Sequence, residues 1–318
     1  MQPAERRIEI FAPFGEAYEL TRRILFEPFD LAKWLVLGFA AFLALLSGGG
    51  GFNFRFNLSD ADLNFRSMRD DALEATNTVP PWAIARIVGI AVIVIAVIIV
   101  CMWLGARGKF IFADCVVRNR AAIVEPWKEY RREANSYFLF SLVAALLVLA
   151  ATALASAPLW LPLATGGEFP TGVLFVVEVS VAVIVFALVA GAVGLVSSFM
   201  VPIMYRRRCR AREGMKAALA AIAAYPGPVI LYALFKFVLL VAVVLISCVL
   251  ACVTCCIAAI PYVGTVLLLP VHVFMMSYLL LFVRQFGPEY DAWGTLAVET
   301  PPPGDRPSSE PPPLPVPV

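Results

Sequence analysis

Six long apolar runs constrain this chain more than any other feature of its sequence. They cover roughly residues 31–47, 83–105, 137–161, 173–201, 229–258 and 263–284. A helix that crosses the hydrocarbon core of a bilayer needs about 20 mainly apolar residues, and only the first run is short by that measure. The chain is 61% hydrophobic and 15% charged, whereas soluble domains have about 25% charged residues. The sequence therefore predicts an all-α integral membrane protein with about six transmembrane helices.

The distribution of Lys and Arg predicts how these helices are oriented. If the runs cross the membrane in alternation, twenty of the 25 cationic side chains fall on the side of both termini. Only three fall on the other side, and Arg86 and Lys236 lie within the runs. Because cytoplasmic loops carry an excess of Lys and Arg, both termini are predicted to be cytoplasmic. We expect a multi-pass protein of the bacterial inner (plasma) membrane.

This orientation divides the chain into three parts. Residues 1–30 are expected to be a cytoplasmic segment with an interfacial helix. Residues 31–284 are expected to form the six-helix membrane domain, with an outer loop at 48–82. Residues 285–318 are rich in proline, which predicts a disordered cytoplasmic tail. A proline-rich tail is also a candidate docking segment for an unidentified protein partner.

Three prolines at regular spacing suggest an internal repeat. Pro28, Pro126 and Pro226 are separated by 98 and 100 residues, and a helical pattern precedes each of them. Proline ends a helix because it lacks an N–H and clashes with the preceding turn. The predicted unit is an interfacial helix, a proline break and two spans, repeated three times. The alternative is that any six-span protein has three inner segments at similar spacing.

Several short motifs carry a resemblance to a known family. They are Pro13-Phe14, Phe26-Glu27-Pro28-Phe29-Asp30-Leu31, Trp34, Leu37-Gly38-Phe39, the glycine run at 48–51, Arg118-Asn119-Arg120, Pro126-Trp127 and Tyr130-Arg131. The chain resembles an uncharacterised family of bacterial multi-pass membrane proteins over most of residues 11–290. That family is similar to the membrane domain attached to some glycerophosphoryl diester phosphodiesterases. The resemblance implies a plasma-membrane location, and it carries over no catalytic residue.

Two ionisable residues inside the predicted spans are candidates for a ligand or proton site. His272 lies in the sixth run, two residues after Pro270, and Glu178 lies in the fourth. Ionisable groups within a membrane are costly and are therefore functional candidates. Pro270 should also free the backbone carbonyl near Val266 and bend the helix there. The alternatives are a neutral, hydrogen-bonded histidine and a glutamate that stays protonated or reaches the outer interface. Lys236 is expected to extend to the headgroups.

A basic cluster follows the fourth run and is a candidate for lipid headgroups. It comprises Arg206, Arg207, Arg208 and Arg210. Clusters of this kind next to a transmembrane helix suit anionic headgroups, and their minimum role is to fix topology. A metal site built from Cys252, Cys255 and His272 is conceivable, but helix packing by small side chains is the favoured interpretation of these cysteines. We therefore predict no metal site and no cofactor.

No nucleotide-binding, hydrolase or metalloprotease motif is present, so no catalytic residue is predicted. The basic residues are not interleaved with aromatics in a soluble segment, which argues against nucleic acid as a partner. The leading hypothesis is a non-enzymatic membrane protein that organises or assists membrane lipids or partner proteins. The alternative is a small-solute transporter or channel with a site at the repeat interface, using Glu178 and His272. An intramembrane enzyme acting on lipid ranks third, because it needs a polar cluster at one depth.

Overall fold

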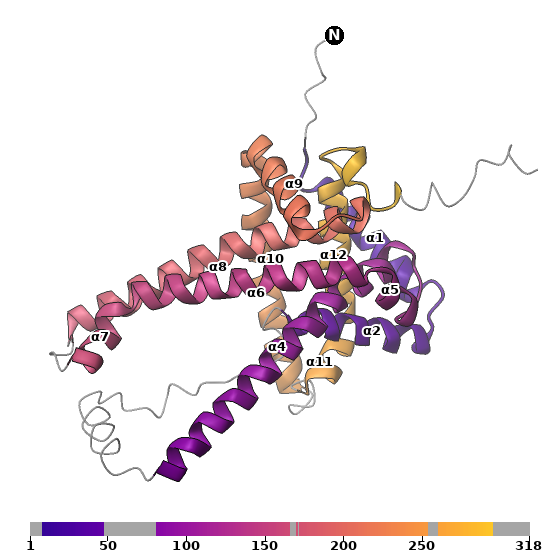
Figure 1. The fold of residues 1–318 in the computed structure, drawn as a ribbon. Coiled ribbons are helices and arrows are strands. Elements are labelled where there is room, and N and C mark those ends of the chain that lie inside the picture. Colours follow the sequence, from indigo (N-terminus) through magenta and orange to yellow (C-terminus); the bar gives the residue numbers. More distant parts are fainter. Residues whose placement is uncertain (1–7, 48–80, 166–169, 171, 254–259, 295–318) are drawn as a thin grey trace, which may run out of the picture.

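The computed structural model describes residues 8–47, 81–165, 170, 172–253 and 260–294, and all regular structure in these ranges is helical (Figure 1). The helices are α1 (Ala12–Phe26), α2 (Leu31–Leu46), α4 (Pro81–Val117), α5 (Val124–Glu129), α6 (Arg131–Ala155), α7 (Ala157–Thr165), α8 (Val173–Arg207), α9 (Ala211–Ala224), α10 (Pro226–Val253), α11 (Pro261–Leu267), α12 (Leu269–Arg284) and the 3-10 turn η2 (Pro288–Tyr290). Nearly all of the expected outer loop, and the tail from residue 295, lie outside the described residues.

Four of the described helices are long and apolar enough to cross a membrane. They are α4, α6, α8 and α10, with crossing segments of 33, 25, 35 and 25 residues. This confirms the helical, membrane-type character predicted from the sequence. The first and last predicted runs form shorter apolar helices, α2 and α12, of 16 residues each. At 1.5 Å per residue each is about 24 Å long, less than the roughly 30 Å of a hydrocarbon core.

The sixth predicted run is broken where the sequence predicts a bend. Pro270 has no N–H to offer the carbonyl of Val266, and the chain divides at Leu268 into α11 and α12. The indole Nε1 of Trp34 on α2 donates a hydrogen bond of 3.1 Å to that Val266 carbonyl. The predicted bend is confirmed, and a side chain from the first apolar helix binds the carbonyl that the proline leaves free.

The N-terminal helix packs on the last long one. Ala17 and Ile24 on α1 are fully buried, and α1 lies against α12. The Tyr278 hydroxyl of α12 donates a hydrogen bond of 3.3 Å to the carbonyl of Ile10, just before α1. Asp30 then starts α2, where its carboxylate accepts a 2.8 Å hydrogen bond from the backbone N–H of Ala32.

The three predicted repeat units differ in the structure. The first and third begin with separate helices, α1 and α9, before Pro28 and Pro226. In the second unit, residues 110–117 continue α4 without a break, and Pro126 lies inside the short helix α5. A separate interfacial helix is therefore missing from the second unit among the described residues.

Buried side chains gather at one end of the bundle, where the ends of α4, α8 and α12 meet. Phe110, Phe199 and Phe282 are each fully buried there. Tyr290 and Ala292, at the start of the predicted disordered tail, are buried in the same core. By contrast, in the most apolar stretches of α4, α6, α8 and α10, only 0%, 6%, 0% and 11% of the residues are buried. Apolar surface of this extent requires lipid or a partner as its surroundings.

The helices separate away from this end. Helices α6 and α8 run side by side with α7 at their far end, while α4 diverges from the pair (Figure 1). Two long antiparallel helices and a diverging third thus frame the region in which the main cavity lies.

Candidate functional site

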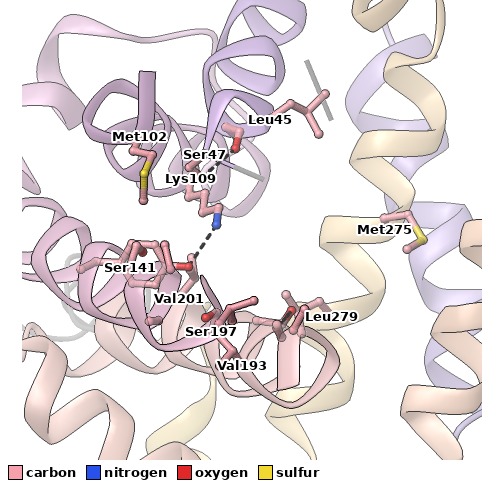
Figure 2. Close-up of a pocket in the computed structure, with 18 of the residues that line it drawn as sticks. Leu45, Ser47, Met102, Lys109, Ser141, Val193, Ser197, Val201, Met275 and Leu279 are labelled. Atoms are coloured by element: carbon pink, nitrogen blue, oxygen red, sulfur yellow. Dashed lines mark hydrogen bonds between the residues drawn. The ribbon is translucent and has the colours of Figure 1, made fainter. Parts of the chain in front are cut away.

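The candidate site is a cavity of about 750 Å³ within the helical bundle. Its walls come from α2, α4, α6, α8, α10 and α12, so it lies where elements from the whole chain meet. Figure 2 shows Lys109 pointing into it from α4, with Met102 and Met275 on opposite sides. Most of the lining is apolar or small, which makes the few polar groups conspicuous.

Two lysines supply the charge of the cavity. The Lys109 ammonium on α4 donates a 3.0 Å hydrogen bond to the Tyr137 hydroxyl on α6. The Lys236 ammonium on α10 donates a 2.6 Å hydrogen bond to the Ser198 hydroxyl on α8. Both lysines line the same cavity. Among the described residues that line the cavity, none is acidic, so both positive charges are without an acidic neighbour in the wall.

The cavity is elongated along α6 and α8. Its lining runs from Tyr137 to Thr152 on α6 and from Phe186 to Val201 on α8. Each stretch contains 16 residues, and its ends are about 22 Å apart along the helix. Because the two helices are antiparallel, Tyr137 and Val201 lie at one end, and Thr152 and Phe186 lie at the other. The lysines lie at the first end, since they bond Tyr137 and Ser198.

The ionisable residues predicted from the sequence to lie within the spans do not all line the cavity. His272 lines the cavity, in the first turn of α12, and its backbone N–H donates to the Leu268 carbonyl at 3.1 Å. Glu178 is half-buried on α8 but does not line the cavity, which begins two turns further along that helix. Lys236, expected to reach the headgroups, instead directs its ammonium to Ser198 in the cavity. The structure thus brings His272 and Lys236 to one site and leaves Glu178 outside it.

No cluster of three or more metal-ligating side chains was found in the part of the chain that the structure describes. Cys252 is exposed on α10, and Cys255 lies outside the described residues. The geometry therefore gives no support to a site formed with His272.

The basic cluster after α8 is largely engaged within the protein. Arg207 forms an ion pair of 3.1 Å with Glu289, beside η2. Arg208 pairs with Glu129 at the end of α5, and its guanidinium lies 3.9 Å from the centre of the Tyr130 ring. Arg206 is half-buried, whereas Arg210 is exposed where α9 begins. Of the four arginines predicted to meet headgroups, Arg207, Arg208 and Arg210 are thus exposed.

A buried ionic network at the same end was only partly visible in the sequence. The Asp114 carboxylate on α4 is completely buried and lies 3.1 Å from Arg118 and 3.0 Å from Arg120. It also accepts hydrogen bonds from the hydroxyls of Tyr205 (3.1 Å) and Tyr130 (3.4 Å). The spacing of Asp114 and Arg118 predicted their pairing. Nothing local predicted the two tyrosines, which come from α8 and from the junction of α5 and α6.

Electrostatics explain why this network holds together. Burial disfavours the charged form of Arg120, but the adjacent Asp114 carboxylate outweighs that cost and raises the pKa of Arg120. Burial also raises the pKa of the Tyr130 phenol well above its usual range, so Tyr130 stays a neutral donor. The network therefore joins α4, α8 and the junction of α5 and α6 through a carboxylate with four partners.

Comparison with known proteins places the chain in a family. The profile of a family of unknown function matches residues 9–287, which is most of the chain. No curated protein and no solved structure matches it. These comparisons do not support the expected similarity to the membrane domain of glycerophosphoryl diester phosphodiesterases, which rests on the short motifs alone.

Proposed function

We propose that this chain, which belongs to the Family of unknown function (DUF7544), is a non-enzymatic membrane protein that binds an anionic lipid or lipid-like molecule in its cavity. The observation that carries the proposal is the pair Lys109 and Lys236 in an apolar wall without an acidic described residue. Placing a charged group in such surroundings has a high free-energy cost unless the group has a counter-ion. An anionic ligand would supply that counter-ion.

The positions of the two lysines support this role. They reach the cavity from different helices, α4 and α10, and each is held by a hydroxyl of a third or fourth helix. A hydroxyl partner orients an ammonium without neutralising it, because it accepts a hydrogen bond but carries no charge. Two oriented, uncompensated cations form a binding site for a carboxylate or phosphate group.

We further propose that six helices cross the bacterial inner membrane, with α2 and the α11–α12 pair as the first and last spans. The short length of α2 fits if Lys33 and Trp34 lie at the inner interface and the bilayer thins locally. The excess of Lys and Arg on one side supports cytoplasmic termini. In this orientation, the end of the cavity that carries Lys109 and Lys236 lies in the inner half of the membrane. We also propose that the membrane domain is built from three repeated units. We propose, too, that it is similar to the membrane domain attached to some glycerophosphoryl diester phosphodiesterases.

The ligand proposal is tested by removing the charges. The full-length protein and the double variant Lys109→Ala/Lys236→Ala are purified from the same membranes, and bound lipids are identified by native mass spectrometry. We expect the double variant to retain at least about tenfold less anionic lipid, and Lys109→Arg/Lys236→Arg to restore retention. Lys216→Ala, at an exposed position on α9, is the matched control. Equal lipid retention by the double variant would overturn the proposal.

Orientation has its own test. Cysteine introduced as Arg210→Cys, in a chain whose native cysteines are replaced, should react with an impermeant maleimide only after the inner membrane is opened. Labelling of intact spheroplasts at this position would place the basic segment on the periplasmic side and contradict the proposed topology.

Transport of a small solute is the second candidate, because His272 and Lys236 share one cavity. A transporter must move its substrate between two aqueous sides, whereas a lipid-binding protein need not. Reconstituted vesicles distinguish them: flux of a small anion that stops in Lys236→Ala or His272→Ala favours transport. Retention of lipid without flux favours the proposed function.

A lysine that contacts a serine can also act as the base that activates a serine nucleophile, and Lys236 contacts Ser198. The Ser198 hydroxyl, however, donates its proton to the Gly194 carbonyl at 2.7 Å and accepts from the lysine. A base would have to receive that proton. The geometry therefore supports an orienting role for Ser198 and favours binding over catalysis.

A further inference from the structure

We infer that the ligand is a single-chain anionic amphiphile, with its charged group between Lys109 and Lys236 and its hydrocarbon chain along the α6–α8 side of the cavity. This inference rests on the proposed function and adds the shape and chemical class of the ligand. Fatty-acid anions and single-chain phospholipids share the required chemistry, namely one anionic group and one chain.

The length of the cavity supports one chain of ordinary size. The lining extends about 22 Å along each of the two helices. One leaflet of a bilayer has a hydrocarbon thickness of about 15 Å, half of the whole core. The cavity is therefore long enough for an anionic group and a chain that spans one leaflet.

The wall changes character along this length. At one end are the polar groups of Lys109, Tyr137 and Lys236. Toward the other end the wall is formed by side chains such as Val148 and Phe186. Thr152 is polar, but its hydroxyl already donates to the Val148 carbonyl at 2.8 Å and needs no ligand. A ligand with charge at one end and hydrocarbon at the other complements both ends of this wall.

The volume of the cavity is sufficient for one chain. At about 750 Å³ the cavity falls within the range of about 300–1,000 Å³ that holds one ligand of drug size. A phospholipid with two chains is considerably larger than such a ligand. The rim also includes Leu149 and Phe186, which are 66% and 51% exposed on helices that face lipid. The chain can therefore enter sideways from the bilayer.

Small residues on α8 create the space for the chain. Gly194 lines the cavity, and a Cβ atom added to it would meet no atom within 4 Å. A larger side chain at this position would therefore project into the cavity without displacing the backbone. Gly191, one turn earlier on the same helix, also has open space around it but does not line the cavity. The two glycines form a matched pair for testing where the chain lies.

The experiment measures binding of oleate, octanoate and inorganic phosphate to the full-length protein in nanodiscs of zwitterionic phosphatidylcholine. We expect Gly194→Leu to weaken oleate binding about tenfold or more, because several chain methylenes lose their contacts. Gly194 lies four residues, about 6 Å of helix, from Ser198, so octanoate also reaches it and should bind the variant more weakly, whereas inorganic phosphate, which has no chain, should bind the variant as it binds the wild type. Gly191→Leu should bind oleate unchanged, and Lys109→Ala/Lys236→Ala should lose both fatty acids.

The outcomes separate the two proposals. If the lysine variant loses oleate but Gly194→Leu does not, the anionic site stands and the position of the chain is wrong. If phosphate competes with oleate and binds as tightly, the site takes a small anion and the single-chain inference fails. Tighter binding of two-chain phosphatidylglycerol than of its lyso form would overturn the limit to one chain. If the lysine variant binds oleate normally, both proposals fail together.

Discussion

The hydroxyl of Tyr205 on α8 donates a hydrogen bond of 3.1 Å to the buried carboxylate of Asp114 on α4, 91 residues earlier in the chain. Asp114 also holds Arg118 and Arg120, so a single carboxylate joins two long helices and the connection that follows α4. Loss of this carboxylate would leave Arg118 and Arg120, whose side chains are 16% and 29% exposed, with Glu125 and Glu129 as their remaining acidic partners.

We therefore expect Asp114→Ala to destabilise the protein by about 3 kcal/mol, at the lower end of the effect of removing one partner of a buried ion pair, because both arginines keep a second carboxylate. Tyr205→Phe removes the hydrogen bond to the charged Asp114 carboxylate and should cost about 2 kcal/mol. Thermal unfolding in detergent, followed by intrinsic fluorescence, measures both. Tyr18→Phe, at a side chain that is 60% exposed, is the control and should have no effect. A stable Asp114→Ala variant would show that the network does not hold α4 and α8 together.

Close packing of α2 on α4 depends on Gly108. A Cβ atom at this position would lie 2.4 Å from the backbone nitrogen of Ala44, so the two helices would have to move apart. Small residues allow such close approach between helices in lipid. Gly108→Ala should therefore destabilise the protein by about 3 kcal/mol. Gly89→Ala, in open space on the same helix, should be neutral or stabilise it slightly, because alanine favours helix. Equal effects of the two variants would contradict the packing.

The hydrogen bond from Trp34 to the Val266 carbonyl exists because Pro270 does not occupy that acceptor. Trp34→Phe should cost about 1 kcal/mol through loss of this bond. In a Pro270→Ala background the alanine N–H can bond the same carbonyl, so Trp34→Phe should cost less there. A double-mutant cycle of unfolding free energies tests this coupling. Additive effects would mean that the proline and the tryptophan act independently.

Arg107 is held between two aromatic rings. Its guanidinium lies 4.6 Å from the centre of the Trp103 ring and 4.7 Å from that of Trp127, and it donates to Asn135 at 3.0 Å. A lysine keeps the charge but has no planar group to stack on both rings. Arg107→Lys should therefore cost about 1–2 kcal/mol.

The control for this prediction is Arg86→Lys, at an exposed position 5.7 Å from the Trp82 ring. It should change stability by less than about 0.5 kcal/mol. Fluorescence of the tryptophans during unfolding reports both variants, and an unaffected Arg107→Lys would show that stacking contributes nothing measurable.

The sequence alone determined the membrane character, the approximate positions of the apolar helices and the break at Pro270. These features depend on composition and on residues a few positions apart: an apolar run has the length of a bilayer, and a proline removes the N–H of its own turn. The pairing of Asp114 with Arg118 was likewise predictable, because four residues bring two side chains to one face of a helix.

Only the tertiary structure decided which side chains meet across helices. Lys236 was expected to reach the headgroups, and instead it binds Ser198, 38 residues away. No sequence pattern singled out Lys109, whose partner Tyr137 comes from another helix, α6. Helical periodicity fixes the face on which a residue lies but not the helix that this face contacts. In lipid, moreover, packing of helices depends on shape and hydrogen bonds that no local pattern encodes.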